Sequence, residues 1–140
     1  MPGIAVFVDS RGGNTKKVAE AIAGELGVSA GDICGPIPAE TGVLFLGSGV
    51  YGGKPGKAFT KFVDSANFAG TKVALFATSG AARSAETMLA KVADELKGKG
   101  ATVLGTYHCR GKFLFSNRGH PDREDLERAG KFAREVLSKV

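Results

Sequence analysis

The chain has 140 residues, of which 43% are hydrophobic, which is enough for one compact core and too little for two ordinary domains. Its 19 basic and 14 acidic residues give a net charge of +5, which favours anionic ligands or acidic partners. Cys34 and Cys109 are too few for a disulfide framework, no apolar run approaches the length of a membrane span, and no signal peptide is recognisable. We therefore expect residues 1–140 to form a single cytoplasmic domain.

Apolar runs that are unbroken by polar residues predict strands covered on both faces, as in a parallel sheet. Such runs occupy residues 4–8, 43–46 and 73–77, and a fourth, partly β-branched run occupies residues 102–107. Between residues 28 and 40, glycine and proline interrupt the pattern, so a strand there is expected to be short and at the edge of the sheet.

Apolar residues at helical spacing lie between these runs. The stripes consist of Val18, Ala19, Ile22, Ala23 and Leu26; Phe59, Phe62 and Val63; Met88, Leu89, Val92, Ala93 and Leu96; and Leu126, Ala129, Phe132, Ala133, Val136 and Leu137. We expect the first helix to begin at Thr15 or Lys16, the second near Pro55 and the last at Pro121, since proline suits the first helical turn. This alternation predicts an α/β domain with helices on both faces of a parallel sheet.

A loop rich in hydroxyl groups and glycine follows the first predicted strand, with the sequence Asp9-Ser10-Arg11-Gly12-Gly13-Asn14-Thr15. A helix that starts there offers backbone N–H groups to an anion, and Ser10, Asn14 and Thr15 can add side-chain hydrogen bonds. Lys16 and Lys17 add positive charge nearby. We therefore expect this loop to bind phosphate, and the open alternative is that Asn14 or Thr15 only caps the helix.

Two better-known phosphate motifs do not fit the chain. A Walker loop needs Gly-Lys followed by Ser or Thr, whereas here Thr15 precedes Lys16. The dinucleotide fingerprint matches literally at Gly47-Ser48-Gly49-Val50-Tyr51-Gly52. However, no helix is expected to open at its third glycine, and the next predicted strand does not end in the acidic residue that would hold a ribose.

The sequence Ser10-Arg11-Gly12-Gly13-Asn14-Thr15 resembles the phosphate loop of the flavodoxin family. Residues 46–55 and 76–80 are similar to the second and third flavin loops of that family, and residues 119–126 resemble the start of its last helix. The resemblance implies a flavodoxin-like three-layer sandwich, with a five-stranded parallel sheet in the order 2-1-3-4-5 between helices. It also implies flavin mononucleotide (FMN) as a noncovalent cofactor and electron transfer as the function, with no catalytic side chain and no metal.

The resemblance carries the cofactor site onto three loops of this chain. The implied FMN-binding residues are Ser10, Arg11, Gly12, Gly13, Asn14 and Thr15 for the phosphate, Ser48, Gly49, Val50, Tyr51, Gly52 and Gly53 beside the flavin ring, and Thr78, Ser79 and Gly80 in the third loop. Tyr51 is the expected stacking residue. Gly49, Gly52 and Gly53 are expected to let a peptide of their loop reorient as the flavin changes redox state.

Several departures from the family pattern leave the function open. Gly12 replaces a hydroxyl residue, the chain has no tryptophan, and Ala81 and Ala82 stand where a stacking tyrosine is common. One flavin face is thus expected to be open, unless Tyr107 and His108 cover it. An open face favours the first alternative, an FMN-dependent NAD(P)H or quinone oxidoreductase; the second is an interaction module of the same fold without a cofactor.

Basic residues near the site form the last departure, since typical flavodoxins are acidic. Arg11, Lys54 and Arg83 are expected to stabilise the anionic reduced flavin and to give a less negative potential for the last reduction step. We expect redox partner proteins with acidic surfaces, and no nucleic acid, because the basic residues accompany no recognised nucleic-acid motif.

The segment that follows the last predicted strand offers two further candidates. Cys109 lies beside Arg110, which could lower the pKa of its thiol, and Phe113 and Phe115 could form a partner surface if they are exposed. His108 and His120 have no ligating residues at a recognised spacing, so a structural role is expected for both.

Overall fold

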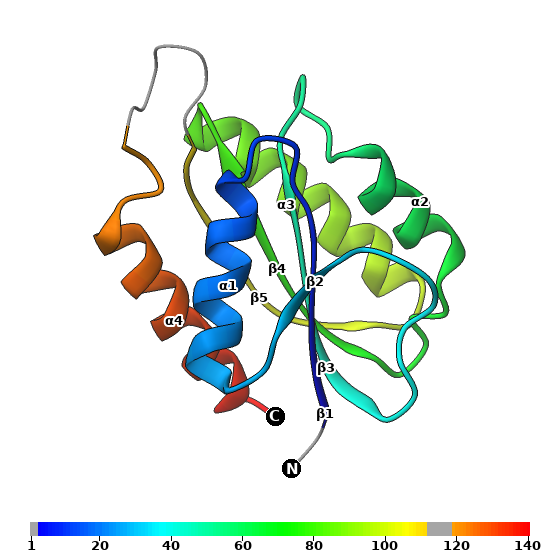
Figure 1. The fold of residues 1–140 in the computed structure, drawn as a ribbon. Coiled ribbons are helices and arrows are strands. Elements are labelled where there is room, and N and C mark those ends of the chain that lie inside the picture. Colours follow the sequence, from blue (N-terminus) through cyan, green and yellow to red (C-terminus); the bar gives the residue numbers. More distant parts are fainter. Residues whose placement is uncertain (1–2, 112–118) are drawn as a thin grey trace.

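A parallel sheet of five strands lies between two layers of helices in the computed structural model, which describes residues 3–111 and 119–140 (Figure 1). The strands pair in the order β2-β1-β3-β4-β5, which confirms the predicted topology. In chain order the elements are β1 (Gly3–Asp9), α1 (Asn14–Leu26), β2 (Ala30–Asp32), β3 (Thr41–Gly49), α2 (Lys57–Ser65), β4 (Lys72–Ser79), α3 (Ala82–Gly98), β5 (Thr102–Arg110) and α4 (Arg123–Leu137).

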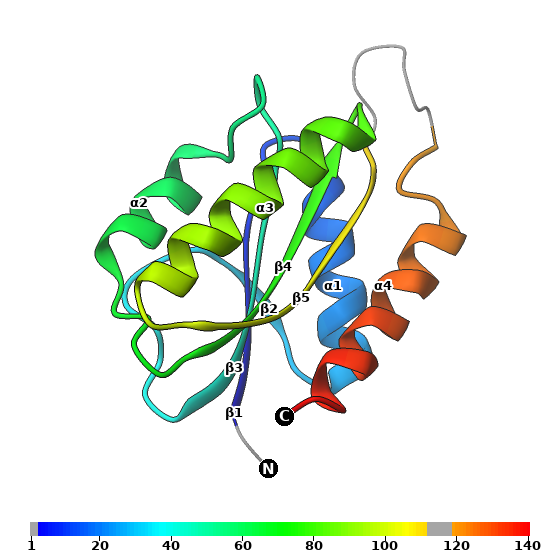
Figure 2. The same cartoon turned by 180° about the vertical axis from the view of Figure 1, so that it is seen from behind.

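Helices α1 and α4 cover one face of the sheet, and α2 and α3 cover the other, as Figures 1 and 2 show from opposite sides. Each face has its own core. Val18 and Ile22 of α1 pack with Phe45 of the sheet on the first face. On the second face, Phe59 and Leu89 belong to the same core as Leu44, Leu46 and Leu75.

The central strands β3 and β4 carry unbroken apolar runs at residues 43–46 and 73–77 because alternate side chains enter opposite cores. Phe45 and Phe76 face α1 and α4, while Leu46 and Leu75 face α2 and α3. The ring of Phe76 lies across Gly47 of the neighbouring strand, so closely that a Cβ atom at position 47 would come within 2.1 Å of the ring. A glycine is therefore required at this point of the sheet.

Strand β2 is the short edge strand that the sequence predicts between residues 28 and 40. It has three residues and pairs only with β1 through Val6, Phe7 and Val8. Its exposed Gly31 and Asp32 show that this edge of the sheet carries little of the core. The packing of the sheet therefore depends mainly on the other four strands, β1, β3, β4 and β5.

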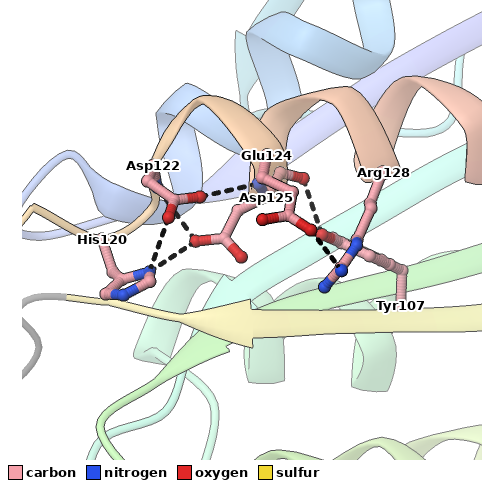
Figure 3. A network of polar contacts seen from close by, with 6 residues as sticks. All are labelled: Tyr107, His120, Asp122, Glu124, Asp125 and Arg128. Atoms are coloured by element: carbon pink, nitrogen blue, oxygen red, sulfur yellow. Dashed lines mark hydrogen bonds and ion pairs between the residues drawn. The ribbon is translucent and has the colours of Figure 1, made fainter.

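The last helix begins later than the sequence predicts. Asp122, and not Pro121, starts it as the N-cap residue: its side chain accepts a hydrogen bond from the Asp125 backbone at 2.8 Å. The Asp125 carboxylate in turn accepts a hydrogen bond from the Asp122 N–H at 2.9 Å, which completes a capping box (Figure 3). Pro121 was expected to start the helix, but it lies directly before this cap, because the reciprocal pair of Asp122 and Asp125 fixes the start at Asp122.

Other element boundaries shift by a few residues. The first helix begins at Asn14, one residue before the expected start, and the second begins at Lys57, two residues after Pro55. Strand β5 continues beyond the expected residue 107 to Arg110.

Phe113 and Phe115, which could form a partner surface if they are exposed, lie outside the described residues. Within the part of the chain that the structure describes, no helix combines the length and apolar character needed to cross a membrane.

Candidate functional site

A cavity of about 210 Å³ opens at the carboxyl edge of the sheet, where the loops after β1, β3 and β4 meet. Strand β2, which follows β1 in the chain, lies on one side of the β1–β3 pair, whereas β4, which follows β3, lies on the other side. The cavity therefore lies at the point between β1 and β3 where the strand order reverses. Such switch points are the usual ligand sites of open α/β sheets. The lining residues are Ser10, Gly12, Asn14, Thr15, Gly49, Val50, Tyr51, Thr78, Ser79, Gly80 and Gly111.

The loop after β1 wraps around the hydroxyl group of Ser10. The Ser10 Oγ accepts hydrogen bonds from the backbone N–H groups of Gly13 at 3.1 Å and of Lys16 at 3.3 Å. Gly13 is the N-cap residue of α1, with a φ of 88° that glycine adopts without strain. Because Gly13 has no side chain, the Ser10 hydroxyl accepts the hydrogen bond from Lys16 that an N-cap side chain would otherwise accept. The alternative that Asn14 or Thr15 caps this helix is therefore wrong. Because its oxygen accepts twice, the Ser10 hydroxyl still has its hydrogen to donate into the cavity.

Two buried hydroxyl groups join the first and third loops. Thr15 Oγ1 lies 2.7 Å from Thr78 Oγ1, and both residues line the cavity. Either hydroxyl can be the donor, so one hydrogen bridges the two oxygens and the other remains to donate to a ligand. The site thus presents hydroxyl donors from Ser10 and from this pair beside the N-terminus of α1.

The loop after β3 returns through a tight turn from Tyr51 to Lys54. The Tyr51 N–H donates to the Lys54 carbonyl at 2.7 Å, and the Lys54 N–H donates to the Tyr51 carbonyl at 3.2 Å. Both residues between them have positive φ, 60° at Gly52 and 78° at Gly53. This is the geometry of a type I′ turn, in which glycine is strongly favoured at both central positions.

Ser48 and Asp9 fix the start of α2 beside the cavity by accepting hydrogen bonds from its backbone. The buried Ser48 hydroxyl donates to the Gly49 carbonyl at 2.8 Å and accepts from the Gly56 N–H at 2.9 Å. Asp9 Oδ2 accepts from the Phe59 N–H at 3.1 Å and so caps α2, whose own N-cap, Gly56, has no side chain. Sequence analysis missed this role of Asp9, although an acidic residue directly after a strand and opposite a helix without a local cap is a usable signal.

Tyr51 forms the aromatic wall of the cavity and is held by Arg11. The Arg11 N–H donates to the Tyr51 hydroxyl at 3.0 Å, and the guanidinium carbon of Arg11 lies 4.1 Å from the centroid of the Tyr51 ring. The hydroxyl packs on Gly49, where an added Cβ atom would lie only 2.4 Å from it. The first and second loops are thus joined by a cation–π contact and a hydrogen bond.

Ten of the fifteen predicted site residues line this cavity. The other five, Arg11, Gly13, Ser48, Gly52 and Gly53, shape the loops around it in the ways described above. Gly111 is a lining residue that sequence analysis missed: a Cβ atom at this position would lie 3.0 Å from Asn14 Nδ2 and 3.2 Å from the Thr78 Cβ atom. Its only sequence signal is a glycine directly after the last strand.

Tyr107 and His108 do not cover the cavity, contrary to the sequence-based suggestion. The Tyr107 ring stacks on Phe132 with centroids 5.6 Å apart, and its hydroxyl donates to the Asp125 carbonyl at 2.7 Å, so this residue belongs to the packing of α4. His108 Nε2 lies 3.4 Å from a carboxylate oxygen of Glu86 on α3. Among the described residues, the aromatic side chain that lines the site is Tyr51.

Cys109 is not an activated thiol. Burial and the nearby Asp125 carboxylate raise the pKa of the Cys109 thiol to about 12, so the expected effect of Arg110 is absent. Its partly buried side chain packs against the core beneath α1 and α4. A role as a nucleophile or redox centre at neutral pH is therefore disfavoured.

His120 has two carboxylate neighbours that its sequence spacing did not reveal. Its Nδ1 lies 2.7 Å from an Asp125 oxygen and 3.8 Å from an Asp122 oxygen, and the three side chains could in principle ligate a metal (Figure 3). Burial raises the pKa of Asp125, but hydrogen bonds from His120 and Asp122 outweigh it and hold the pKa below its usual range. Because both carboxylates serve the capping box of α4, the cluster has a structural explanation.

The comparisons with known proteins agree with this geometry. The family model for the flavodoxin domain matches residues 5–118. An uncharacterized protein of Methanocaldococcus jannaschii is 30% identical in an alignment 135 positions long, and the match covers 89% of this chain and 90% of the relative.

Solved structures show the same fold. A flavodoxin from the domain Archaea superposes with a TM-score of 0.77 at 21% identity, covering 98% of this chain and 97% of that one. Oxidised Flavodoxin 1 from Bacillus cereus gives a TM-score of 0.75 at 22% identity over 98% of this chain and 97% of its own. With the family model, the relative and the site geometry in agreement, the chain belongs to the flavodoxin family.

Proposed function

We propose that this protein binds FMN noncovalently in the cavity at the carboxyl edge of the sheet and carries electrons between partner proteins. The observation that supports this most is the joint presence of phosphate donors and one aromatic wall in a single cavity. Ser10, Thr15 and Thr78 supply hydroxyl groups, the N-terminus of α1 supplies backbone dipoles, and Tyr51 supplies the wall.

The donors fit the phosphate end of a flavin nucleotide. A phosphate accepts hydrogen bonds and carries up to about two negative charges near neutral pH, and the start of α1 places Lys16 and Lys17 beside the loop. Gly12 and Gly13 have open space where a side chain would stand, so the backbone can approach an anion closely. Bound FMN would supply the redox chemistry, while the protein would supply position and electrostatics.

The aromatic end of the cavity fits the flavin ring less completely. Its volume of about 210 Å³ is below the roughly 300 Å³ of a pocket that buries a drug-sized ligand. The ring would therefore be only partly enclosed, or Tyr51 would move away from Gly49 as the ring enters. A partly exposed ring edge suits electron transfer, because a partner can approach it closely.

Reconstitution with FMN tests this proposal directly. The purified protein is mixed with FMN, riboflavin or inorganic phosphate, and binding is followed by calorimetry and by flavin absorbance. We expect saturable binding of FMN with one site per chain and weaker binding of riboflavin, which lacks the phosphate. A protein that gives no heat and no spectral change with FMN would instead support the flavodoxin-shaped interaction module.

An FMN-dependent oxidoreductase is the second candidate, supported by the open third loop. Ala81 and Ala82 are exposed and bring no aromatic side chain over the cavity, and Tyr107 is turned toward α4. A nicotinamide or quinone would then have access to the flavin. Anaerobic mixing of the FMN-loaded protein with NADH or NADPH distinguishes the two functions: rapid direct bleaching supports the enzyme, whereas bleaching only through a separate reductase supports the carrier.

A further inference from the structure

Three helices of this protein depart from a general electrostatic rule at the same edge of the sheet. The N-terminal turns of α1, α2 and α3 lie at the carboxyl edge of the sheet (Figure 1) and contain no acidic residue. The partial positive charge of a helix N-terminus favours acidic side chains and disfavours cations. Helix α4 follows the rule, with Glu124 and Asp125 in its first turn. Such local departures in an otherwise regular fold point to function.

Exposed cations stand in the first turns of these helices and in the loops beside them. Among the described residues, the elements that meet at this edge carry seven of them: Arg11, Lys16, Lys17, Lys54, Lys57, Arg83 and Arg110. They come from the loop after β1, the first turn of α1, the turn after β3, the first turns of α2 and α3, and the end of β5. We call these seven residues the basic rim.

The basic rim is not neutralised by carboxylates of the same edge. In residues 3–111 and 119–140, no rim residue lies in an ion pair. The nearby carboxylates have other partners: Asp9 caps α2, and Glu86 lies beside His108. Three carboxylates line a surface hollow together with Lys17, and they also have other partners: Asp122 caps α4, Glu25 pairs with Arg134 and Glu127 pairs with Arg123. The positive charge of the rim is therefore available to a ligand.

One phosphate group cannot account for this charge. A phosphate brings up to about two negative charges, whereas the rim carries seven positive ones. None of the seven rim residues is among the residues that line the cavity. An anion much larger than a nucleotide is needed to cover the whole rim.

We propose that the basic rim is the docking face for the acidic surface of a redox partner protein. The choice of a redox partner rests on the proposed function, because a protein that transfers electrons must bring its flavin edge close to its partner. Arg11, Lys16 and Arg110 are chain neighbours of residues that line the cavity, so a partner attracted to them would meet the flavin. A single-stranded nucleic acid is disfavoured because Tyr51, the aromatic side chain that lines the cavity in the described part of the chain, has one ring face covered by Arg11.

Matched probes of opposite charge test the docking face without requiring flavin. Native cytochrome c is basic, and cytochrome c with succinylated lysines is acidic, while both keep the same haem and fold. Binding of each to the apo and FMN-loaded protein is measured by calorimetry at low and at physiological ionic strength. We expect the acidic form to bind at least about tenfold more tightly at low ionic strength, and this preference to shrink with added salt.

Charge-reversal variants locate the binding face. The double variant Lys57→Glu with Arg110→Glu changes rim residues that do not line the cavity, so FMN binding serves as its folding check. The matched control is Lys97→Glu with Lys99→Glu, which makes the same charge change at the far end of α3, on the amino edge of the sheet. We expect the rim variant to lose most of the preference for the acidic probe and the control to keep most of it.

Three results would overturn the proposal. One is equal or tighter binding of the native, basic cytochrome c. The second is an equal loss in the rim and control variants, since net charge alone would then explain the binding. The third is a 20-base-pair DNA duplex that binds more tightly than the acidic protein and is released by the rim substitutions. Failure of FMN to bind would refute the redox proposal separately, because the docking measurement is also made on the apo protein.

Discussion

The guanidinium of Arg11 lies 4.1 Å from the centroid of the Tyr51 ring, while the backbone N–H of the same arginine donates to the Tyr51 hydroxyl. Two residues 40 positions apart in the chain thus fix the Tyr51 ring to the phosphate loop. Any change in the phosphate loop that moves Arg11 should therefore also move the Tyr51 ring, which is expected to contact the flavin.

Arg11→Ala is expected to weaken FMN binding about fivefold, since a partly exposed cation–π contact contributes up to about 1 kcal/mol. The chain has two tyrosines and no tryptophan, so in a Tyr107→Phe background the near-ultraviolet circular dichroism of tyrosine reports on Tyr51 alone. That signal should fall in Arg11→Ala and be partly kept in Arg11→Lys. Lys17→Ala removes a nearby charge without touching Tyr51 and should leave it unchanged. An unaltered tyrosine signal in Arg11→Ala would show that Tyr51 is held by other contacts.

Gly52→Ala and Gly53→Ala are each expected to lower the free energy of unfolding by about 1 kcal/mol, because both positions have positive φ. Urea denaturation provides the measurement. Gly24→Ala is the control: it lies within α1 with open space around it, and alanine there should stabilise the protein by about 0.5–1 kcal/mol. Equal effects at the three positions would contradict the type I′ turn.

Asp9→Ala should remove the cap of α2 and lower the free energy of unfolding by about 1–2 kcal/mol. Asp9→Asn keeps an acceptor oxygen and should cost less. The local reporter is the Phe59 amide, which donates to Asp9 and should exchange its hydrogen faster in Asp9→Ala. Unchanged exchange of that amide would mean that another acceptor caps the helix.

Asp125 makes the stability of the protein depend on pH in the acid range. Its pKa is lower in the folded state than in the unfolded chain, so its contribution is fully present above an unfolded pKa of about 4. The contribution is lost as the pH falls through the folded pKa. The difference in urea midpoint between the wild type and Asp125→Asn should therefore be largest near pH 7 and shrink as the pH falls below the unfolded pKa of about 4. A constant difference over this range would contradict the role of the ionised carboxylate.

The basic surroundings of the cavity predict the direction of its redox potential. Exposed Arg11, Lys54 and Arg83 should stabilise the anionic, fully reduced flavin, and the potential of the last reduction step should be less negative than in an acidic flavodoxin. Lys54→Gln should make it more negative by tens of millivolts. Spectroelectrochemistry of the FMN-loaded protein gives both values, and a potential as low as that of an acidic family member would refute this prediction.

The topology and most of the cavity could be predicted because they depend on local sequence. Unbroken apolar runs mark strands that are buried on both faces, and the loop 10–15 carries its donors within six consecutive residues. The position of Tyr107 could not be predicted in this way. Its direction depends on Phe132 and Asp125, which lie in the last helix and are brought close only by folding.

The roles of Asp9 and Ser48 were missed or only partly described for the same reason. Each accepts a hydrogen bond from a backbone N–H at the start of α2, and the sequence around Asp9 or Ser48 does not show which distant backbone group folding will bring to it. The thiol of Cys109 shows the converse: Arg110 is its neighbour in sequence, but burial among distant residues controls the pKa. Neighbours in the sequence therefore predicted the residues of the cavity loops better than they predicted the pKa of a buried group.

Gly47, Gly49 and Gly52 satisfy three unrelated steric demands, although they stand at the spacing of a nucleotide-binding signature. The first makes room for the Phe76 ring, the second for the Tyr51 hydroxyl, and the third for a backbone turn with positive φ. Neighbouring parts of one sheet edge can therefore reproduce a recognised glycine pattern by coincidence. If this stretch replaced the glycine motif of a dinucleotide-binding protein, it would bring three glycines that serve local packing and no affinity for a second nucleotide.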